Sequence, residues 1–435
     1  MRIDTSTYII GLTASFGSGC STFQGILKKE FDYRTYSLSK LVKDKWSQKN
    51  QSRKIDEATR KELQDIGNLM REKKGLEYLA KEIINIADRE TKSYEKNKPI
   101  VFDSFRNIAE VEYFRKVFPY FYLISINCTP IERWKRCKDK YKSLGLKHRD
   151  FIEDDKRDKN EDIPEGQQIE LCTDESDISI NNETSYSDAS LREYVLKNNL
   201  RNLLGLLTGD ETRTPLPKEV YMNVAYAASL MSNCYKRQVG AAIVNPDGVI
   251  LSIGYNENPT PIRPCLEQFE YCYKDIYKKD FFNDLINSAC PNPECKKILD
   301  HIPSNYRCPY CNFDLDGYYI RDRAASRCSA LCAEEKAIIN AGLSSLDKCI
   351  IYTTTFPCFS CAQKIIYTGI KTIYYAESYP DRDSAKLLDI AKKIYEDRNE
   401  EGIKVYAFQG VKKKGYFKLF GDWRRETEKK ILKRG

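Results

Sequence analysis

The sequence predicts an α/β protein of two domains. Its 435 residues exceed one typical core, because a domain usually holds roughly 100–200 residues. In the first half, short apolar segments alternate with helical ones, which is typical of strands joined through helices into a parallel sheet. Residues 209–217 (GDETRTPLP) have the composition of a linker. We therefore expect one domain at 1–208 and a second at 218–435.

The first domain is expected to begin with a buried strand and to end with a helix. Residues 8–13 (YIIGLT) form a short apolar run that leads into a Gly/Ser-rich turn. The elements expected after it are a helix from Thr22, a helical stretch at 57–95, a strand at 100–102, a helix at 108–117 and a strand at 121–126. Residues 149–183 are highly charged, so we expect a mobile segment that returns to a last strand at 178–180. A closing helix is expected at 191–207.

The second domain is expected to alternate helices and strands around an insert. A helix at 219–233 precedes a hairpin of strands at 239–244 and 249–253. Residues from about 263 to 326 are rich in cysteine and irregular in pattern, which indicates an insert. A helix, a strand at 349–354, a second helix and a further strand follow.

Composition argues against a membrane protein. The chain is 41% hydrophobic and 31% charged, and no apolar run approaches the roughly 20 residues needed to cross a bilayer. Residues 1–7 show no signal-peptide pattern, so we expect a cytoplasmic protein without a membrane partner. The net charge of +8 could attract nucleic acid, but basic and acidic residues are interleaved, which favours a solvated surface.

Cysteine usage points to metal binding. Sixteen cysteines in a long cytoplasmic chain are expected to be metal ligands or buried thiols rather than disulfides. The chain has two histidines, His148 and His301, so any zinc site must be built mainly from thiolates.

Three cysteines near two helix starts form the strongest candidate for chemistry. Residues 332–334 (CAE) open one helical pattern, and residues 357–361 (PCFSC) open another. Cys358 and Cys361, on the first turn of a helix, can ligate one metal, and the positive end of the helix helps to hold them as thiolates. With Cys332 as the third ligand, the fourth position of a tetrahedral zinc stays open for water, whose pKa zinc lowers towards roughly 7.

Glu334 is the candidate general acid and base. Two residues from a ligand, it is placed to take a proton from the water and to pass it to the ring nitrogen and the leaving ammonia. Together with the Pro-Cys-x-x-Cys signature, this is the three-cysteine form of the zinc-deaminase arrangement. A closed zinc knuckle is the alternative, although closed sites need four ligands and no neighbouring carboxylate. Three thiolates also call for a nearby cation, for which Arg327 and Lys336 are candidates, although an exposed surface position is the favoured interpretation of each.

Residues 219–420 resemble the cytidine and deoxycytidylate deaminase superfamily. Residues 221–232 and 236–244 (KRQVGAAIV) look like its first helix and strand, residues 254–256 match its Gly-Tyr-Asn turn, and Cys332 stands where the family commonly has His. The resemblance implies a hydrolase that acts on a cyclic amidine C–N bond. It also implies substrate contacts from Asn256, Ala333 and Tyr379. A plain turn is the alternative for the Gly-Tyr-Asn segment.

A second set of cysteines predicts a structural zinc in the insert. Cys290 and Cys295 (CPNPEC) precede Cys308 and Cys311 (CPYC), which is the plan of a zinc ribbon. Four ligands close the coordination sphere, so this zinc would stabilise an insert too poor in apolar residues to fold alone. Four unconnected buried cysteines are the alternative. Possible substitute ligands are Cys265, Cys272 and His301, and expected buried thiols are Cys234, Cys328 and Cys349.

The first domain carries the pattern of a phosphate-binding loop. Residues 14–21 (ASFGSGCS) follow a strand and precede a helix, so backbone N–H groups would face an anion. Cys20 replaces the lysine that meets the β and γ phosphates, so we expect nucleotide docking to survive and phosphoryl transfer to be impaired. Ser21 and Asp103 could hold Mg²⁺. The expected nucleotide-binding residues are Gly17, Ser18, Gly19, Cys20, Ser21, Thr22, Asp103 and Arg106.

The region around Asp103 resembles nucleotide kinases. Residues 103–107 (DSFRN) are similar to the acidic strand end and arginine of nucleoside-monophosphate and dephospho-coenzyme A kinases, and Arg133, Arg136 and residues 149–157 resemble their lid. This implies a P-loop kinase-like αβα domain, followed by a cytidine-deaminase-like αβα domain with a zinc-ribbon insert.

The combination of the two domains resembles the antiphage deoxycytidine nucleotide deaminases of bacterial defence. Residues 377–380 (ESYP) and 405–420 agree with this narrower match. It implies conversion of dCTP and dCMP to dUTP and dUMP, a regulatory nucleotide-binding first domain, a homo-oligomer and, as a further candidate partner, an inhibitory RNA. A housekeeping dCMP deaminase, a nucleic-acid cytosine or adenine deaminase and a non-enzymatic nucleotide-binding regulator remain as alternatives.

Overall fold

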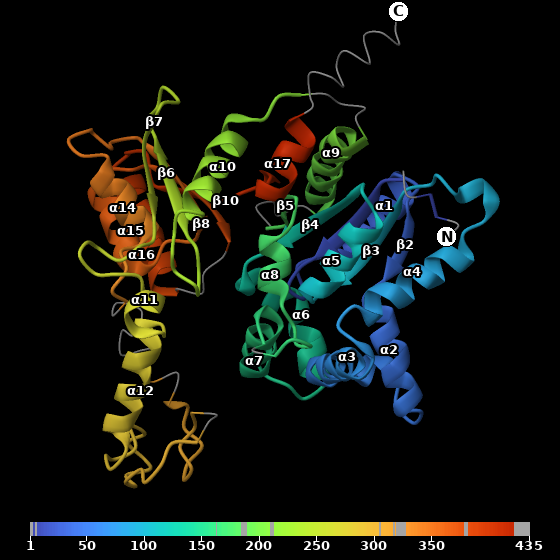
Figure 1. Ribbon diagram of the computed structural model, residues 1–435, viewed down its shortest axis with the longest axis horizontal. Coiled ribbons are helices and arrows are strands. Elements are labelled where there is room, and N and C mark those ends of the chain that lie inside the picture. Colours follow the sequence, from blue (N-terminus) through green and yellow to red (C-terminus); the bar gives the residue numbers. More distant parts are fainter. Residues whose placement is uncertain are drawn as a thin grey trace, which may run out of the picture. The chain divides into compact units, whose positions relative to one another are not determined.

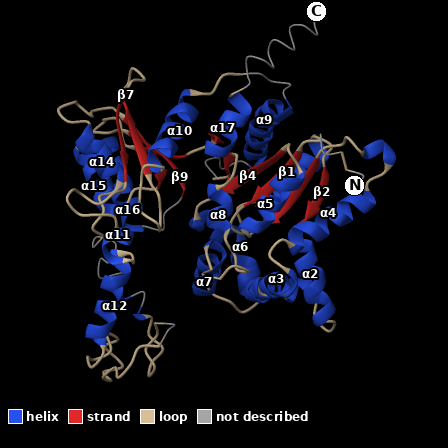
Figure 2. Ribbon diagram, in the orientation of Figure 1, coloured by secondary structure: helices blue, strands red, loops and turns tan. Residues whose placement is uncertain are grey.

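The chain folds into two compact α/β units in the computed structural model (Figures 1 and 2). One unit contains Met1–Val220 and Ala407–Gly435, and the other contains Tyr221–Tyr406. The structure describes residues 3–4, 7–161, 163–183, 189–208, 213–303, 306–315, 318, 328–377 and 382–421. None of the helices in these ranges is long and apolar enough to cross a membrane. Each unit has its own sheet, which confirms the predicted fold class.

The first unit is built on a six-stranded sheet with the order β11-β5-β4-β1-β3-β2. The strands are β1 (Ile9–Thr13), β2 (Arg34–Ser37), β3 (Ile100–Phe105), β4 (Phe121–Asn127), β5 (Ile178–Asn181) and β11 (Gly410–Val411). β1 lies at the centre and pairs in parallel with β3 and β4. The pairing of β11 with β5 is antiparallel, whereas the other four pairings are parallel. The predicted parallel sheet is therefore present, with an added antiparallel edge.

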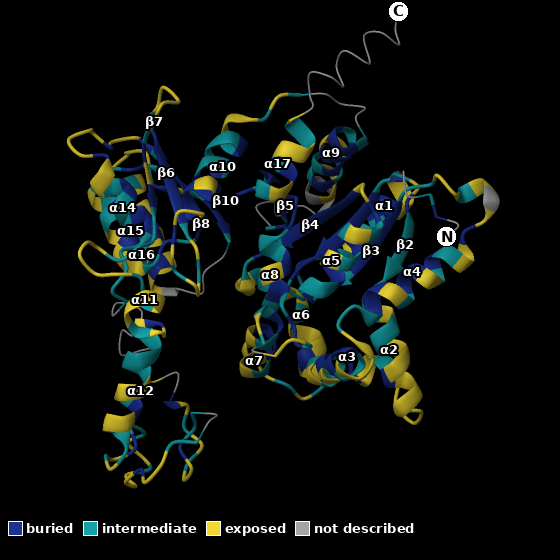
Figure 3. Cartoon of the chain, viewed as in Figure 1, coloured by how far each residue is buried: buried dark blue, intermediate teal, exposed yellow. Residues whose placement is uncertain are grey.

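Helices cover both faces of this sheet. The helices of this unit are α1 (Cys20–Glu30), α2 (Leu38–Lys49), α3 (Arg60–Lys74), α4 (Tyr78–Glu90), α5 (Ile108–Val117), α6 (Pro130–Ser143), α7 (His148–Lys159), α8 (Ile169–Asp174), α9 (Ala189–Thr208) and α17 (Lys413–Phe420), with short 3₁₀ turns at Ile55–Glu57 and Ser93–Glu95. Because strand side chains alternate, Ile10 packs with α1 and α9, whereas Ile9 packs with α4 and α5. The strands β1, β3, β4 and β5 are buried along most of their length, whereas β2 is half-buried (Figure 3).

The segment expected to be mobile at 149–183 instead forms α7, α8 and β5. Its charged side chains are paired with distant residues. The fully buried carboxylate of Asp158 accepts hydrogen bonds from Arg60 at 2.7 Å, Arg106 at 3.0 Å and Gln64 at 2.7 Å. A buried charge must be compensated in this way. Because the partners lie far away in the sequence, composition alone indicated a mobile segment, whereas the ion pairs hold this segment in an ordered fold.

The C-terminal residues also differ from the expected domain boundary. Ala407–Gly435 belongs to the first unit rather than to a second domain that runs to 435. β11 adds to the first sheet, and the buried side chain of Lys412 donates to Thr173 O at 2.6 Å. A strand of two residues leaves no periodic signal in the sequence.

The second unit has a five-stranded sheet with the order β10-β9-β8-β6-β7. The strands are β6 (Gly240–Val244), β7 (Ile250–Tyr255), β8 (Ile350–Thr355), β9 (Thr372–Glu377) and β10 (Lys404–Ala407). β6 is antiparallel to both β7 and β8, and β8 is parallel to β9. The helices are α10 (Pro217–Ser229), α11 (Cys265–Phe269), α12 (Tyr273–Leu285), α14 (Ala333–Asn340), α15 (Phe359–Tyr367) and α16 (Arg382–Asp397).

A glycine lets α14 approach the sheet. A Cβ atom on Gly254 of β7 would lie 2.2 Å from Ala333 O and 2.4 Å from Ala337 N, which no real contact allows. Ala333 and Ala337 pack with Ile351 of β8 in the core of this unit. Gly254 therefore fixes how the first turn of α14 lies against the sheet.

Glu219 joins the start of α10 to β11 within the first unit. Its fully buried carboxylate accepts hydrogen bonds from Arg213 at 2.7 and 2.8 Å, from Leu216 N at 2.8 Å and from Val411 N at 3.0 Å. Burial raises the pKa of Glu219, but these hydrogen bonds, led by the one from Arg213, lower it overall. The ionised form is therefore the one that stabilises the fold.

We predict that Glu219→Gln lowers the free energy of unfolding of the first unit by about 1–3 kcal/mol at neutral pH, because a buried charge-assisted network loses its charge. Since the folded pKa is the lower one, the difference from the unmodified protein should shrink as the pH falls below about 4.3 and through the folded pKa. Urea unfolding followed by circular dichroism measures this difference. Glu72→Gln, an exposed carboxylate on α3, is the control; equal stability of the two variants at neutral pH would contradict the account.

Candidate functional site

The structure brings the three predicted cysteines together. The Sγ atoms of Cys332, Cys358 and Cys361 all lie within 4.8 Å of one another, with 3.9 Å between Cys332 and Cys358. Cys332 is the N-cap residue of α14, Cys358 is the N-cap residue of α15, and Cys361 lies in the first turn of α15. Two helix N-termini therefore face one point, and their dipoles favour thiolates there.

The three thiols share their protons unequally. Hydrogen bonds from Cys332 and Cys361 lower the pKa of Cys358. Contact with Cys358 raises the pKa of Cys332, and contact with Cys332 and Cys358 raises the pKa of Cys361. The first thiolate is stabilised by its two neighbours, and further ionisation then opposes an existing negative charge. A cation at the centre would remove that opposition, so this donor set fits a soft or borderline metal such as zinc.

Glu334 lies beside the sulfurs in the first turn of α14 and is 4% exposed. Its Oε1 atom accepts a hydrogen bond from Thr353 Oγ1 at 3.1 Å. Burial, assisted by the charge of Cys358, raises the pKa of Glu334 to about 7 against the opposing hydrogen bonds. A carboxyl group with this pKa can both accept and release a proton near neutral pH.

The three expected substrate contacts have different outcomes. Asn256 Oδ1 accepts from Val239 N at 2.7 Å, and Asn256 Nδ2 donates to Arg237 O at 2.9 Å, so this amide braces the segment before β6. Ala333 is fully buried, so its side chain offers no surface to a ligand. Tyr379 lies outside the described residues.

Lys336, one of the two cations expected to offset the charge of three thiolates, pairs with another group. Lys336 Nζ donates to Glu257 Oε1 and lies 3.4 Å from the centre of the Tyr255 ring. The positive charge of Lys336 is thus already paired with a carboxylate. Arg327, the other candidate, lies outside the described residues.

The four cysteines of the insert also meet. The Sγ atoms of Cys290, Cys295, Cys308 and Cys311 lie within 4.8 Å of one another, and Cys290 and Cys311 are 3.8 Å apart. A hydrogen bond from Asn292 leads the effects that lower the pKa of Cys311 to about 7. Within the described ranges, this cluster and the one at Cys332 are the two groups of three or more potential ligands that gather so closely. Four thiols fit a closed structural zinc site.

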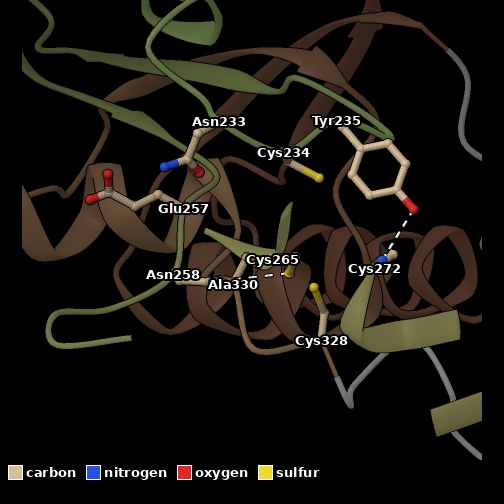
Figure 4. Close-up of a pocket in the computed structure, with 9 residues that line it drawn as sticks. All are labelled: Asn233, Cys234, Tyr235, Glu257, Asn258, Cys265, Cys272, Cys328 and Ala330. Atoms are coloured by element: carbon tan, nitrogen blue, oxygen red, sulfur yellow. Dashed lines mark hydrogen bonds between the residues drawn. The ribbon is translucent and has the colours of Figure 1, made fainter. Parts of the chain in front are cut away.

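The proposed substitute ligands do not join that cluster. Cys265 and Cys272 line a separate cavity of about 20 Å³ together with Cys234 and Cys328 (Figure 4). Cys234 and Cys328 are half-buried rather than buried, whereas Cys349 is buried as expected. His301 is an exposed residue that pairs with Asp300 at 2.9 Å.

The phosphate-binding loop has the expected turn. Gly17 and Gly19 adopt φ angles of +81° and +106°, which favour glycine, and Cys20 begins α1. Burial and the neighbouring carboxylate of Asp103 raise the pKa of the Cys20 thiol to about 12. Asp103 is 3% exposed, and its Oδ1 atom is buried without a hydrogen-bond partner. An orphaned carboxylate oxygen beside a phosphate loop fits a bound cation.

The remaining loop residues are placed as follows. Ser18 is buried, whereas Ser21 and Thr22 are exposed on α1. Arg106 pairs with Asp158, so its charge is already used within the fold.

Side chains from other elements hold the loop itself. Arg136 donates to Gly17 O at 3.2 Å, and Arg133 donates to Phe16 O at 3.3 Å. Asn182, just after β5, donates to Ser18 O at 2.6 Å. The sequence singled out the two arginines but missed Asn182, for which a polar residue at the end of the last strand was the available signal.

Comparisons with known proteins agree with this geometry. Residues 217–377 match the family described as cytidine and deoxycytidylate deaminase zinc-binding region, and residues 10–162 match a family described as AAA domain. A deoxycytidylate deaminase of Saccharomyces cerevisiae is 28% identical over 310 residues, which cover 70% of this chain and 81% of the relative. A probable deoxycytidylate deaminase of Drosophila melanogaster is 42% identical over 157 residues, or 35% of this chain and 57% of the relative.

A solved structure of the dCMP deaminase from cyanophage S-TIM5 aligns over 45% of this chain and all of its own, with 21% identity and a TM-score of 0.25. The matched zinc-binding region contains both cysteine clusters and Glu334. Most of the second unit therefore lies within the region that matches the zinc-binding deaminase family. The chain is a hydrolytic deaminase, joined to a unit with a P-loop domain match.

We predict that the purified protein carries two zinc ions per chain and that Cys308→Ser leaves one, because an insert with few apolar residues cannot keep its fold around a site that has lost one of four thiolates. The insert should then become sensitive to protease, while the cluster at Cys332 keeps its metal. Inductively coupled plasma mass spectrometry counts the zinc. Cys349→Ser, a buried thiol outside both clusters, is the control and should keep two ions; two ions in Cys308→Ser would refute the ribbon.

Proposed function

We propose that this protein deaminates free deoxycytidine nucleotides, dCMP and dCTP, to the corresponding deoxyuridine nucleotides. The proposal rests on one observation: three sulfur atoms lie together beside one buried carboxylate. In the described part of the chain, no fourth potential ligand joins this cluster. The three-sulfur cluster leaves room for water, which a purely structural site would not. Relatives named deoxycytidylate deaminases support the choice of pyrimidine.

The reaction adds water to C4 of the cytosine ring and releases ammonia. Cys332, Cys358 and Cys361 would hold a zinc ion, which would supply an acidified water as the nucleophile. Glu334 takes a proton from this water and delivers it to the N3 atom of the ring. Glu334 then takes the second proton and delivers it to the departing amino group, so that the carboxylate ends as it began. Burial suits this role because it keeps Glu334 away from bulk water.

We propose that the first unit binds a nucleotide and regulates the deaminase. The P-loop match at 10–162, the glycine conformations and the orphaned oxygen of Asp103 support binding, with Mg²⁺ as an accompanying ion. Cys20 offers no positive charge to the β and γ phosphates, and its raised pKa keeps it neutral. Regulation without phosphoryl transfer is the role left to such a site.

The wider role that we propose is depletion of deoxycytidine nucleotides in antiphage defence, by a cytoplasmic homo-oligomer. This proposal is supported by the presence, in one chain, of a P-loop unit that lacks the phosphate-binding lysine and of a deaminase unit. A housekeeping dCMP deaminase is the alternative for the same chemistry, and an inhibitory RNA is a further candidate partner.

We predict that the purified protein forms uracil from dCMP or dCTP, that Glu334→Gln reduces turnover by at least about 100-fold, and that no ADP appears when ATP is present. Glutamine keeps the shape of the side chain but cannot relay a proton. Chromatography of reactions with dCMP, dCTP, CTP, ATP and single-stranded DNA measures all three outcomes. Glu335→Gln, the neighbouring carboxylate of α14, is the matched control and should retain activity.

Two outcomes would contradict the proposal. Undiminished turnover by Glu334→Gln would remove Glu334 from the mechanism. Deamination of single-stranded DNA without deamination of free nucleotides would replace the proposal with the nucleic-acid alternative.

A further inference from the structure

Thr353 occupies the middle of the second sheet. It lies on β8, opposite Ala241 of β6 and Tyr375 of β9, and it is fully buried. Because side chains alternate along a strand, Thr353 shares a face with Ile351, which packs against α14. Thr354 therefore points to the opposite face. The alternation places the hydroxyl of Thr353 on the same side as the metal ligands.

That hydroxyl contacts the candidate proton carrier. Thr353 Oγ1 lies 3.1 Å from Glu334 Oε1 and 2.9 Å from Thr355 O. A hydroxyl has one hydrogen to donate and two lone pairs with which to accept. The Thr353 hydroxyl can therefore donate to only one of these two acceptors at a time. Rotation of the O–H bond switches the hydrogen from one acceptor to the other.

We propose that Thr353 is a positioning residue, whose hydroxyl holds the Glu334 carboxylate where it can relay protons between water and the ring. This inference rests on the proposed function. A β-branched residue in a central strand is stiff at χ1, so its oxygen is a fixed point in the sheet. Glutamate has three side-chain torsions of its own, and a displacement of about 1 Å is enough to slow a reaction about 100-fold.

The same hydroxyl can follow both states of the relay. When Glu334 is ionised, Thr353 donates its hydrogen to Oε1. When Glu334 carries the transferred proton, Thr353 can turn its hydrogen to Thr355 O and accept a hydrogen bond from the carboxylic acid. Thr353 and Glu334 thus share a hydrogen bond in either state, so the carboxyl group keeps its position while its charge changes.

The test compares Thr353→Ser with Thr353→Ala, which both lack the methyl group and differ only in the hydroxyl. With dCMP as substrate, we expect Thr353→Ser to keep kcat within about threefold of the unmodified protein. We expect Thr353→Ala to lower kcat by about 10- to 100-fold, with KM and zinc content unchanged, because proton transfer is affected and binding is not. Steady-state kinetics and metal analysis on the full chain supply these values.

A matched control lies next to Thr353 on the same strand. Thr354 is also buried, and its Oγ1 accepts a hydrogen bond from Gly240 N at 3.1 Å on the opposite face. Thr354→Val is expected to lower the thermal midpoint and to leave kcat unchanged. This variant separates loss of a buried hydroxyl in general from loss of the hydroxyl at Glu334.

Equal kcat values for Thr353→Ser and Thr353→Ala would overturn the inference, whether both are high or both are low, because the hydroxyl would then have no separate effect. In either case the unmodified protein would still deaminate, so the proposed function would stand. If the unmodified protein forms no uracil from any nucleotide, the proposed function fails and this inference fails with it.

Discussion

The meeting of two helix N-termini is the constraint on which the deaminase unit depends. Cys332 is the N-cap residue of α14 and Cys358 is the N-cap residue of α15, and their sulfur atoms meet in one cluster. Unpaired backbone N–H groups and aligned dipoles make such a point favourable for negative charge. Three thiolates and a carboxylate at one place would otherwise repel one another, so the helix ends and a bound cation together make the cluster tolerable.

The sheet determines where those helices start. The glycine at 254 allows α14 to lie against β7, and Ile351 of β8 fills the core beneath it. The carboxylate of Glu334 then faces the strand that carries Thr353. The reacting groups therefore depend on backbone packing as much as on the identity of the ligands.

Much of this could be predicted from the sequence, because the decisive signals are local. The spacing of Cys358 and Cys361 and the adjacency of Cys332 and Glu334 are set within single helical turns. The strand-loop-helix order around Gly17 and Gly19 is equally local, and the alternation of strands with helices fixed the fold class. Patterns confined to a few residues do not require knowledge of distant partners.

The parts that escaped prediction rest on distant contacts. Asp158 makes α7 part of an ordered network only because Arg60 and Arg106 reach it, and β11 exists only because β5 offers an open edge. The pairing of Lys336 with Glu257 could not be inferred either, since the two lie 79 positions apart. The tertiary fold determines such pairings, and composition does not predict which two distant residues will pair.

A crystal structure of the zinc-loaded protein, with anomalous data collected at the zinc edge, tests the central claim most directly. The account predicts a peak about 2.3 Å from each of the three sulfurs of Cys332, Cys358 and Cys361, with a water as the fourth ligand in hydrogen-bonding reach of Glu334. A fourth protein side chain on that ion, or no anomalous peak among the three sulfurs, would contradict it.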